Sequence, residues 1–230
     1  MNAIDISTMR QINGQMGSNP GGIFQDVNGR RFYVKSLESP AYACNEIVAA
    51  NLYQLAGAPT LTYVETTQPN QVATELVLLE KNNVTQLSLI ERKQAQHWLG
   101  VHAWTANWDV AGFQGDNQGV VNGTVITLDM GGALEFRAMG DPKGKAFGTI
   151  VGELETLRRN EDNPFALKLF GDMDESDIQS AIKVVTKISD ERIRQVIADH
   201  GGSDALAEKM IARKTDMAKQ LTAKNVGYVR

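Results

Sequence analysis

The chain has 230 residues, of which 42% are hydrophobic and 22% are charged, and its formal net charge is −4. This composition is typical of a globular protein with one substantial core or two small lobes. Binding to nucleic acid as a main function needs a basic surface, so no specific nucleic acid is expected as a partner. A single cysteine, Cys44, excludes an internal disulfide and predicts a buried, inert thiol.

No apolar run approaches the roughly 18 residues that a membrane span requires. The first 15 residues lack the basic region and the apolar core of a Sec signal. We therefore expect a monomer in a reducing compartment such as the cytoplasm, or a protein exported by a specialised secretion system. The pattern along the chain predicts an N-terminal arm at 1–15, a first lobe at 16–81 and a second lobe at 82–230.

The first chemical signal is the glycine-rich run GSNPGG at residues 17–22, which opens into a strand. Glycines at this density allow positive φ angles and let the backbone approach a ligand closely. A tight hairpin turn is the competing interpretation. The run is not a Walker A loop, because no Gly-Lys-Ser/Thr follows. It is not a Rossmann fingerprint either, because no strand precedes it and no helix follows.

A strand and a helix come next and carry one charged residue each. The sequence RRFYVKSL at 30–37 alternates as a strand does and places Lys35 near its end. Pro40 suits the first turn of a helix expected at 41–55, with Glu46 one to two turns in. A strand lysine and a helix glutamate are by themselves usually solvated. Their order after the glycine-rich run favours a pair in which Glu46 holds Lys35.

Further elements are expected before the central stretch. Two strands are predicted at 61–66 and 72–80, and a helix is predicted at 89–103. His97 and His102 lie five residues apart, so they do not share a helix face as ligands at i and i+4 would. They are therefore interpreted as structural side chains and not as a metal pair.

The central stretch, TANWDVAGFQGDNQGVVNGTVITLDMGG at 105–132, collects three chemically useful side chains. Asp109 follows Asn-Trp, Asn117 follows Asp116 beyond a glycine-rich turn, and Asp129 follows a short apolar strand. Carboxylate and amide oxygens are the hard ligands that Mg²⁺ requires, and Mg²⁺ usually takes only one or two carboxylates from a protein. We expect the rest of the chain to support this stretch.

Basic residues beyond this stretch are ambiguous. Arg137, Lys143 and Lys145, in and before a charged loop at 141–145, could receive an acidic substrate group, although a solvated loop is the competing interpretation. The remainder is predicted to be helical, including a short helix at 148–157. The last helix, expected at 203–224, is a weak docking or membrane-surface candidate against the simpler interpretation of a solvated helix face. Its basic residues, with the one that follows it, are Lys209, Arg213, Lys214, Lys219, Lys224 and Arg230.

Taken in order, these motifs resemble the atypical bacterial kinases of the HipA-like group. They resemble still more closely the minimal HopBF-type effector kinases and related kinase-like domains of phages. The shared features span residues 17–132: the Ser-Asn-Pro-Gly-Gly loop, a Tyr-Val-Lys strand, an Asn-Glu helix, Asn-Trp-Asp, Asp-Asn and Asp-x-Gly-Gly. The resemblance implies an α+β fold with two lobes. The first lobe would hold a small antiparallel sheet and one helix, and the second would be mainly helical.

The resemblance also implies an activity, namely ATP- and Mg²⁺-dependent phosphorylation of a protein serine or threonine. Asp109 would position the acceptor hydroxyl, Asn117 and Asp129 would hold Mg²⁺, and Lys35, held by Glu46, would contact the nucleotide. The backbone around 79–81 would face the adenine ring. The partner implied is a protein substrate, such as a host chaperone or a translation factor. The remaining nucleotide-binding residues would be Ser18, Asn19, Gly21 and Gly22.

The chain departs from the ordinary kinase pattern in ways that leave alternatives open. Asp109 and Asn117 are eight residues apart, which is longer than the usual interval, so Asp116 could replace Asn117 as the metal ligand. No His-Arg precedes Asp109, and Met130 stands where ordinary kinases have phenylalanine. The alternatives are transfer of AMP or a glutamyl group on the same fold, or a non-catalytic kinase-like binding or virion-associated protein.

Overall fold

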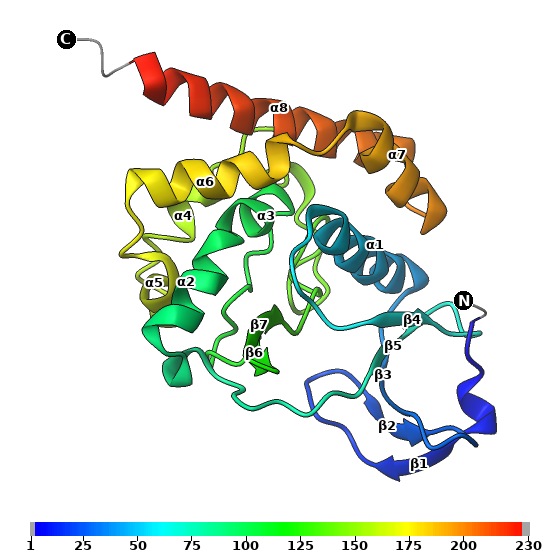
Figure 1. Cartoon of the computed structure of the whole chain (residues 1–230). Helices are drawn as coiled ribbons and strands as arrows, with labels where there is room; N and C mark the ends of the chain where they lie inside the picture. The colour runs from blue at the N-terminus through cyan, green and yellow to red at the C-terminus, as the bar shows by residue number, and fades with distance from the viewer. Residues whose placement is uncertain (1–2, 227–230) are drawn as a thin grey trace.

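The computed structural model describes residues 3–226 and divides into a sheet-containing part and a helical part (Figure 1). The first part holds a five-stranded antiparallel sheet in the order β1-β2-β3-β5-β4, with helix α1 packed on it. This arrangement confirms the α+β, two-lobed fold that was expected. The elements of this part are β1 (Arg10–Asn13), β2 (Gly21–Gln25), β3 (Arg31–Ser36), α1 (Pro40–Ala56), β4 (Tyr63–Glu65) and β5 (Gln71–Glu75).

Helix α1 connects the two parts of the molecule. Ser39 caps its first turn, and Gly57 ends it with a φ of 81°, a conformation that glycine adopts without strain. Helix α1 contacts β4 and β5 on one side and α7 on the other. The residues in the middle of the helix are therefore buried or half-buried. Cys44 on this helix is half-buried, and its S–H donates to the carbonyl of His200 at 3.3 Å. Burial raises the pKa of this thiol. Because the thiolate is the reactive form, a raised pKa agrees with the predicted inert cysteine.

In the sheet-containing part, the structure corrects the predicted bounds of the N-terminal arm and of one strand. Residues assigned to an arm form the turn η1 (Ile6–Thr8) and strand β1, because Ile6 packs against Phe32 and β1 pairs with β2. The strand predicted at 72–80 ends at Glu75. Beyond it the backbone crosses to the helical part, where Glu80 N–H donates to Val120 O at 2.8 Å.

The second part is built from helices around a small hairpin (Figure 1). The helix expected at 89–103 is interrupted at Trp98, and the short helix expected at 148–157 is reduced to one turn. The elements are η2 (Val84–Gln86), α2 (Leu89–His97), α3 (Leu99–Trp104), β6 (Gln118–Val121), β7 (Thr124–Thr127), η3 (Gly144–Ala146), α4 (Glu153–Thr156), α5 (Pro164–Phe170), α6 (Glu175–Thr186), α7 (Asp190–Asp199) and α8 (Asp204–Val226).

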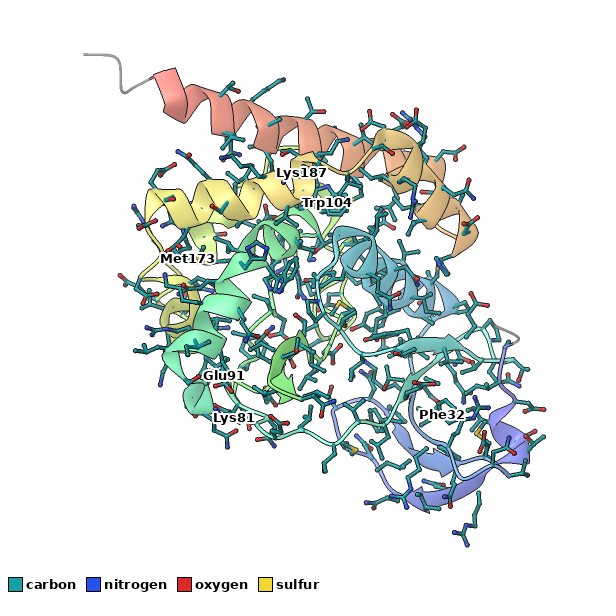
Figure 2. The ribbon with its side chains drawn as sticks, in the orientation of Figure 1. Phe32, Lys81, Glu91, Trp104, Met173 and Lys187 are labelled. Atoms are coloured by element: carbon teal, nitrogen blue, oxygen red, sulfur yellow. The ribbon has the colours of Figure 1, made fainter. Side chains whose placement is uncertain are left out.

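The main core lies among these helices and extends to α1, whereas a smaller cluster lies under the sheet. Trp104 is fully buried in the main core, and Phe32 is buried in the smaller cluster, as Figure 2 shows. His102 is also buried, and its Nδ1 lies 2.8 Å from the hydroxyl of Tyr53. His97 stacks edge-on against Trp98. Both histidines are therefore structural, as predicted.

The last helix does not present a continuous basic face. Arg213 is fully buried, where its guanidinium pairs with Glu153 at 2.9 Å and donates to the carbonyls of Trp104 and Ala103 at 2.7 Å. The expectation for Arg213 was wrong because the tertiary packing of α8 on α3 supplies acceptors that the sequence alone does not reveal. The side chain of Lys224 and the whole of Arg230 lie outside the described part of the chain. Within residues 3–226, no helix has both the length and the apolar character needed to cross a bilayer.

Candidate active site

A cleft of about 600 Å³ lies between the sheet and the segment that carries the β6–β7 hairpin. Its walls come from β3, the connection after β5, and the loops before β6 and after β7. These segments are far apart in the sequence and meet only in the folded chain. Six of the predicted site residues line it: Ser18, Asn19, Lys35, Asp109, Asn117 and Asp129.

Lys35 lies at the back of this cleft and binds two carboxylates. Its Nζ lies 2.8 Å from Oε2 of Glu46 on α1 and 3.2 Å from Oδ1 of Asp129. Glu46 is fully buried behind it, as the predicted Lys35–Glu46 pair requires. Burial by itself would lower the pKa of Lys35, but the negative charges of Asp129 and Glu46 raise it well above its ordinary value. Lys35 is therefore a fixed cation facing the cleft.

Asp129 and the two glycines after Met130 form a tightly packed turn. The N–H of Gly131 donates to Asp129 Oδ1 at 2.8 Å. Partial burial raises the pKa of this carboxyl, but the Lys35 ammonium and the Gly131 N–H outweigh it and lower the pKa. A Cβ on Gly131 would lie 2.8 Å from the hydroxyl of Tyr42, and a Cβ on Gly132 would lie 2.7 Å from Cβ of Asp109. Gly132 thus allows the close approach of the two acidic segments, and Gly131 allows the close approach of this turn to α1.

Asp109 and Asn117 are joined directly. The Asn117 amide nitrogen donates to the backbone oxygen of Asp109 at 2.7 Å and to its Oδ2 at 3.0 Å. The other carboxylate oxygen, Oδ1, is buried and has no hydrogen-bond partner among residues 3–226. Burial and the charge of Asp129 raise the pKa of Asp109 to about 6. Asp109 therefore lines the cleft as a carboxylate whose position is fixed by Asn117.

The donor set fits a magnesium ion that is completed by phosphate oxygens. No cluster of three or more His, Cys, Asp or Glu side chains able to hold a metal by itself occurs in the described chain. Mg²⁺ bound with a nucleotide needs only one or two protein carboxylates, because phosphates and water supply the other ligands. Asn117 uses its nitrogen for Asp109, which leaves its Oδ1 for a cation. Asp116 also lines the cleft, so the choice between Asp116 and Asn117 stays open.

The glycine-rich run is divided between the cleft and the sheet. Gly21 and Gly22 lie in β2, paired with Lys35 and Val34, and they are not among the residues lining the cleft. A Cβ on Gly21 would lie 2.2 Å from the carbonyl oxygen of Val34. The structure therefore gives Gly21 a packing role, and their proposed contact with a nucleotide remains a prediction.

Tyr33 holds the part of this run that does line the cleft. Its hydroxyl accepts hydrogen bonds from the backbone N–H groups of Met16 and Gly17, at 3.2 and 3.1 Å. Sequence reasoning did not identify this residue as functional. The signal was present, because strand alternation places Tyr33 and Lys35 on the same face of β3.

Lys143 is the largest correction to the predicted site. It was expected in a solvated loop or at an acidic substrate group, but it is buried and donates to three backbone carbonyls. Its Nζ lies 2.7 Å from Ala106 O, 2.8 Å from Gly132 O and 2.9 Å from Leu134 O. Ala106 and Leu134 both have positive φ angles, 49° and 53°, which are strained for residues with a side chain. One ammonium thus connects the segment before Asp109 to the segment after Asp129.

The other two basic residues of this region, Arg137 and Lys145, are exposed. The Arg137 guanidinium lies over the ring of Trp108, 5.0 Å from its centroid. Trp108 immediately precedes Asp109, so Arg137 packs beside the catalytic segment without entering the cleft. Its proposed contact with an acidic substrate group stays a prediction.

The connection between the two parts forms the apolar end of the cleft. Leu76, Val77 and Leu79 line it. The backbone of the next two residues is already engaged, since Glu80 N–H donates to Val120 O and Val120 N–H donates to Lys81 O. The Lys81 side chain is paired with Glu91 at 2.5 Å, and both side chains are labelled in Figure 2. Of the predicted 79–81, only Leu79 lines the cleft, and the contact of this backbone with a base stays a prediction.

Solved structures of low sequence identity share this fold. The proinflammatory kinase CtkA of Helicobacter pylori superposes with a TM-score of 0.66 at 14% identity, and the match covers 100% of both chains. The Rio2 kinase of Chaetomium thermophilum, solved as an ADP/Mg²⁺-phosphoaspartate complex, matches with a TM-score of 0.53 at 11% identity. That match covers 93% of this chain and 72% of the Rio2 chain.

Neither protein-family models nor curated protein sequences match the chain. At 11–14% identity the structural likeness establishes the fold alone. The chain therefore has a protein-kinase-like fold, and the chemistry of its cleft has to be argued from its own residues.

Proposed function

We propose that the protein is a phosphotransferase that uses ATP and Mg²⁺ to phosphorylate a serine or threonine of a protein. The observation that carries this proposal is the convergence of two linked sets of side chains on one cleft. Lys35 binds Glu46 and Asp129 on one side, and Asp109 binds Asn117 on the other. Lys35 and Asp129 are 94 residues apart in the sequence, and phosphoryl transfer uses a lysine, a glutamate, two aspartates and an asparagine in this way.

The residues facing the phosphates have distinct roles in this proposal. Lys35, kept charged by Glu46, binds phosphate oxygens of the nucleotide. Asp129 and Asn117, or Asp116 in place of Asn117, hold Mg²⁺. When bound, the ion neutralises charge on the transferring group. The Leu76–Leu79 connection and Leu128 supply apolar contacts for the base.

Asp109 is the residue proposed to orient the acceptor hydroxyl. Its carboxylate lines the cleft, and the amide of Asn117 fixes its orientation. Because its pKa is raised to about 6, the carboxylate remains ionised near neutral pH and is a stronger base than an ordinary aspartate.

The test is incubation of the pure protein with γ-labelled ATP and Mg²⁺, with and without bacterial or eukaryotic lysate, beside Asp129→Ala. Label transfer that is lost in the variant supports the proposal. The variant is expected to fold, because Lys35 keeps its bond to the buried Glu46. Full activity of a folded Asp129→Ala protein would rule out the assigned site.

Two alternatives are decided by the same sample. Mass spectrometry of the product separates an added phosphate of about 80 Da from an added AMP of about 329 Da, or from a glutamyl group. A protein that binds neither nucleotide nor metal and transfers nothing would be a non-catalytic kinase-like scaffold. The presence of Lys35, Asp109, Asn117 and Asp129 in one cleft, with Glu46 behind Lys35, favours catalysis over that scaffold.

A protein of a host cell is the substrate we favour. Two observations support it: the resemblance to effector and phage kinases, and the likeness in fold to a bacterial kinase described as proinflammatory. In this proposal the protein acts either as an effector or as a phage product. The lysate comparison above tests the source of the substrate directly.

A further inference from the structure

The loop between Asp109 and Asn117 displays an aromatic side chain at the cleft. This interval is longer than the usual kinase interval, and Phe113 lies within it. Phe113 lines the same cleft as Asp109, yet it is 76% exposed. A phenylalanine at such a position buries nothing for the fold, so its exposure calls for a functional reason.

The exposure does not come from a loosely held loop. Gly112 N–H donates to Asp109 O at 2.9 Å, and Val84 N–H donates to Gly115 O at 2.7 Å. The amide nitrogen of Asn83 donates to Gln114 O at 2.7 Å. The backbone is thus hydrogen-bonded on both sides of Phe113, to Asp109 before it and to the 83–84 segment after it.

The glycines of the loop fit the same tight construction. Gly112 and Gly115 have φ angles of 74° and 80°. A Cβ on Gly112 would lie 2.3 Å from Asp116 Oδ1, and a Cβ on Gly115 would lie 2.7 Å from the ring of Phe165. The backbone therefore holds Phe113 in a defined position beside the catalytic aspartate.

Two further apolar side chains reach the cleft from other segments. Met139, in the loop after Asp129, is 68% exposed, and Met16, before the glycine-rich run, is 63% exposed. Both line the cleft together with Phe113. Three separate segments thus place large apolar groups at the opening of a site whose interior is charged.

The geometry indicates the kind of molecule that covers these groups. A pocket for a small molecule encloses most of its ligand, whereas Phe113 and Met139 are themselves mostly exposed and cannot enclose one. An extended polypeptide lying across the opening could cover them while its hydroxyl reaches Asp109. Removing apolar side chains of this size from water favours binding.

We propose that Phe113, together with Met139, binds an apolar side chain of the polypeptide that carries the acceptor serine or threonine. This inference rests on the proposed function and names its substrate class. Phe113 is then a specificity-determining residue, and the long Asp109–Asn117 interval exists to present it. Substrates with charged residues beside the acceptor would leave Phe113 and Met139 in water and would be phosphorylated less efficiently.

The test uses synthetic peptides that each contain one serine flanked either by leucine and phenylalanine or by lysine and glutamate. The ratio of kcat/KM for the apolar peptides to kcat/KM for the charged peptides is measured for the wild type, Phe113→Ser and Ile150→Ser. Ile150 is 74% exposed but does not line the cleft, so it is the matched control. A ratio is independent of the fraction of active protein, so partial unfolding of a variant cannot produce the result.

The wild type and Ile150→Ser are expected to prefer the apolar peptides by at least about tenfold. Phe113→Ser is expected to lose that preference through a higher KM for the apolar peptides. The same preference in Phe113→Ser, or none in the wild type, would overturn the docking role while label transfer still supports the kinase. Phe113-dependent phosphorylation of small apolar alcohols, with no peptide labelled, would overturn the polypeptide assignment. Absence of any ATP turnover by the wild type would overturn the proposed function itself and this inference with it.

Discussion

Two buried lysines, Lys35 and Lys143, lie on either side of the Asp129-Met130-Gly131-Gly132 segment and are stabilised in different ways. Lys35 is paired with two carboxylates, and their charges raise its pKa well above the ordinary value. Lys143 is paired with three carbonyls, and burial lowers its pKa to about 7, with the charges of Arg213 and Arg137 acting in the same direction. Full charges compensate the cost of burying a cation more completely than dipoles do.

In the proposed function, this difference separates a residue that binds the nucleotide from one that positions the backbone. Lys35 faces the cleft, and its partner Asp129 is itself partly exposed there, so both can bind a phosphate and its metal ion. Lys143 is enclosed, and its acceptors belong to the segments that carry Asp109 and Asp129. It therefore holds Asp109 and Asp129 in fixed positions relative to each other.

The largest effect is expected from Lys35→Met. Loss of the phosphate-binding cation should lower the rate of label transfer by roughly 10²–10⁴-fold. The fold should survive at neutral pH, since burial raises the pKa of Glu46 to about 7 and this carboxyl can take up a proton when its partner is removed. The rate is measured with γ-labelled ATP and the fold by circular dichroism. Lys81→Met, which breaks an ion pair outside the cleft, is the control and should keep its activity.

Lys143→Met should affect stability as well as activity. The substitution leaves three buried carbonyls without their donor, which we expect to lower the free energy of unfolding by about 3 kcal/mol. It should also lower kcat while the dissociation constant for ATP changes little, because the nucleotide contacts of Lys35 are untouched. Urea denaturation and nucleotide titration measure the two quantities. Lys145→Met, an exposed neighbour, is the matched control, and equal effects of the two variants would contradict the positioning role.

The smallest expected effect is a pH dependence of the free energy of unfolding, which differs between the two lysines. Between about pH 7 and pH 10 the unfolded state keeps the Lys143 proton while the folded state releases it, so this group makes stability rise with pH. The excess stability of the wild type over Lys143→Met should grow by about 2 kcal/mol from pH 7 to pH 9. Lys35 has a raised pKa, and its contribution should stay constant over this range. Urea denaturation at both pH values tests this, and a constant wild-type advantage would contradict the pKa of Lys143.

Much of the site followed from local patterns. The strand with Lys35 and the helix with Glu46 were predicted from sequence patterns, and the site residues from the resemblance to kinases. The structure brings Lys35, Asp109, Asn117 and Asp129 to one cleft and places Glu46 behind Lys35. The cap at Ser39 and the glycine after α1 explain why the helix could be placed, because each satisfies backbone groups within a few residues of itself. Such signals do not depend on the rest of the fold.

Other features were decided by tertiary structure alone. Nothing near Lys143 in the sequence shows that the carbonyls of Ala106, Gly132 and Leu134 converge on it, and nothing near Tyr33 shows that its hydroxyl holds Met16 and Gly17. Burial of a polar side chain depends on partners contributed by distant segments. The sequence by itself therefore determined the elements and the chemical groups that they carry. Only the folded chain decided which of its charged residues face the cleft and which are enclosed, because desolvation and hydrogen bonding act across the packed elements.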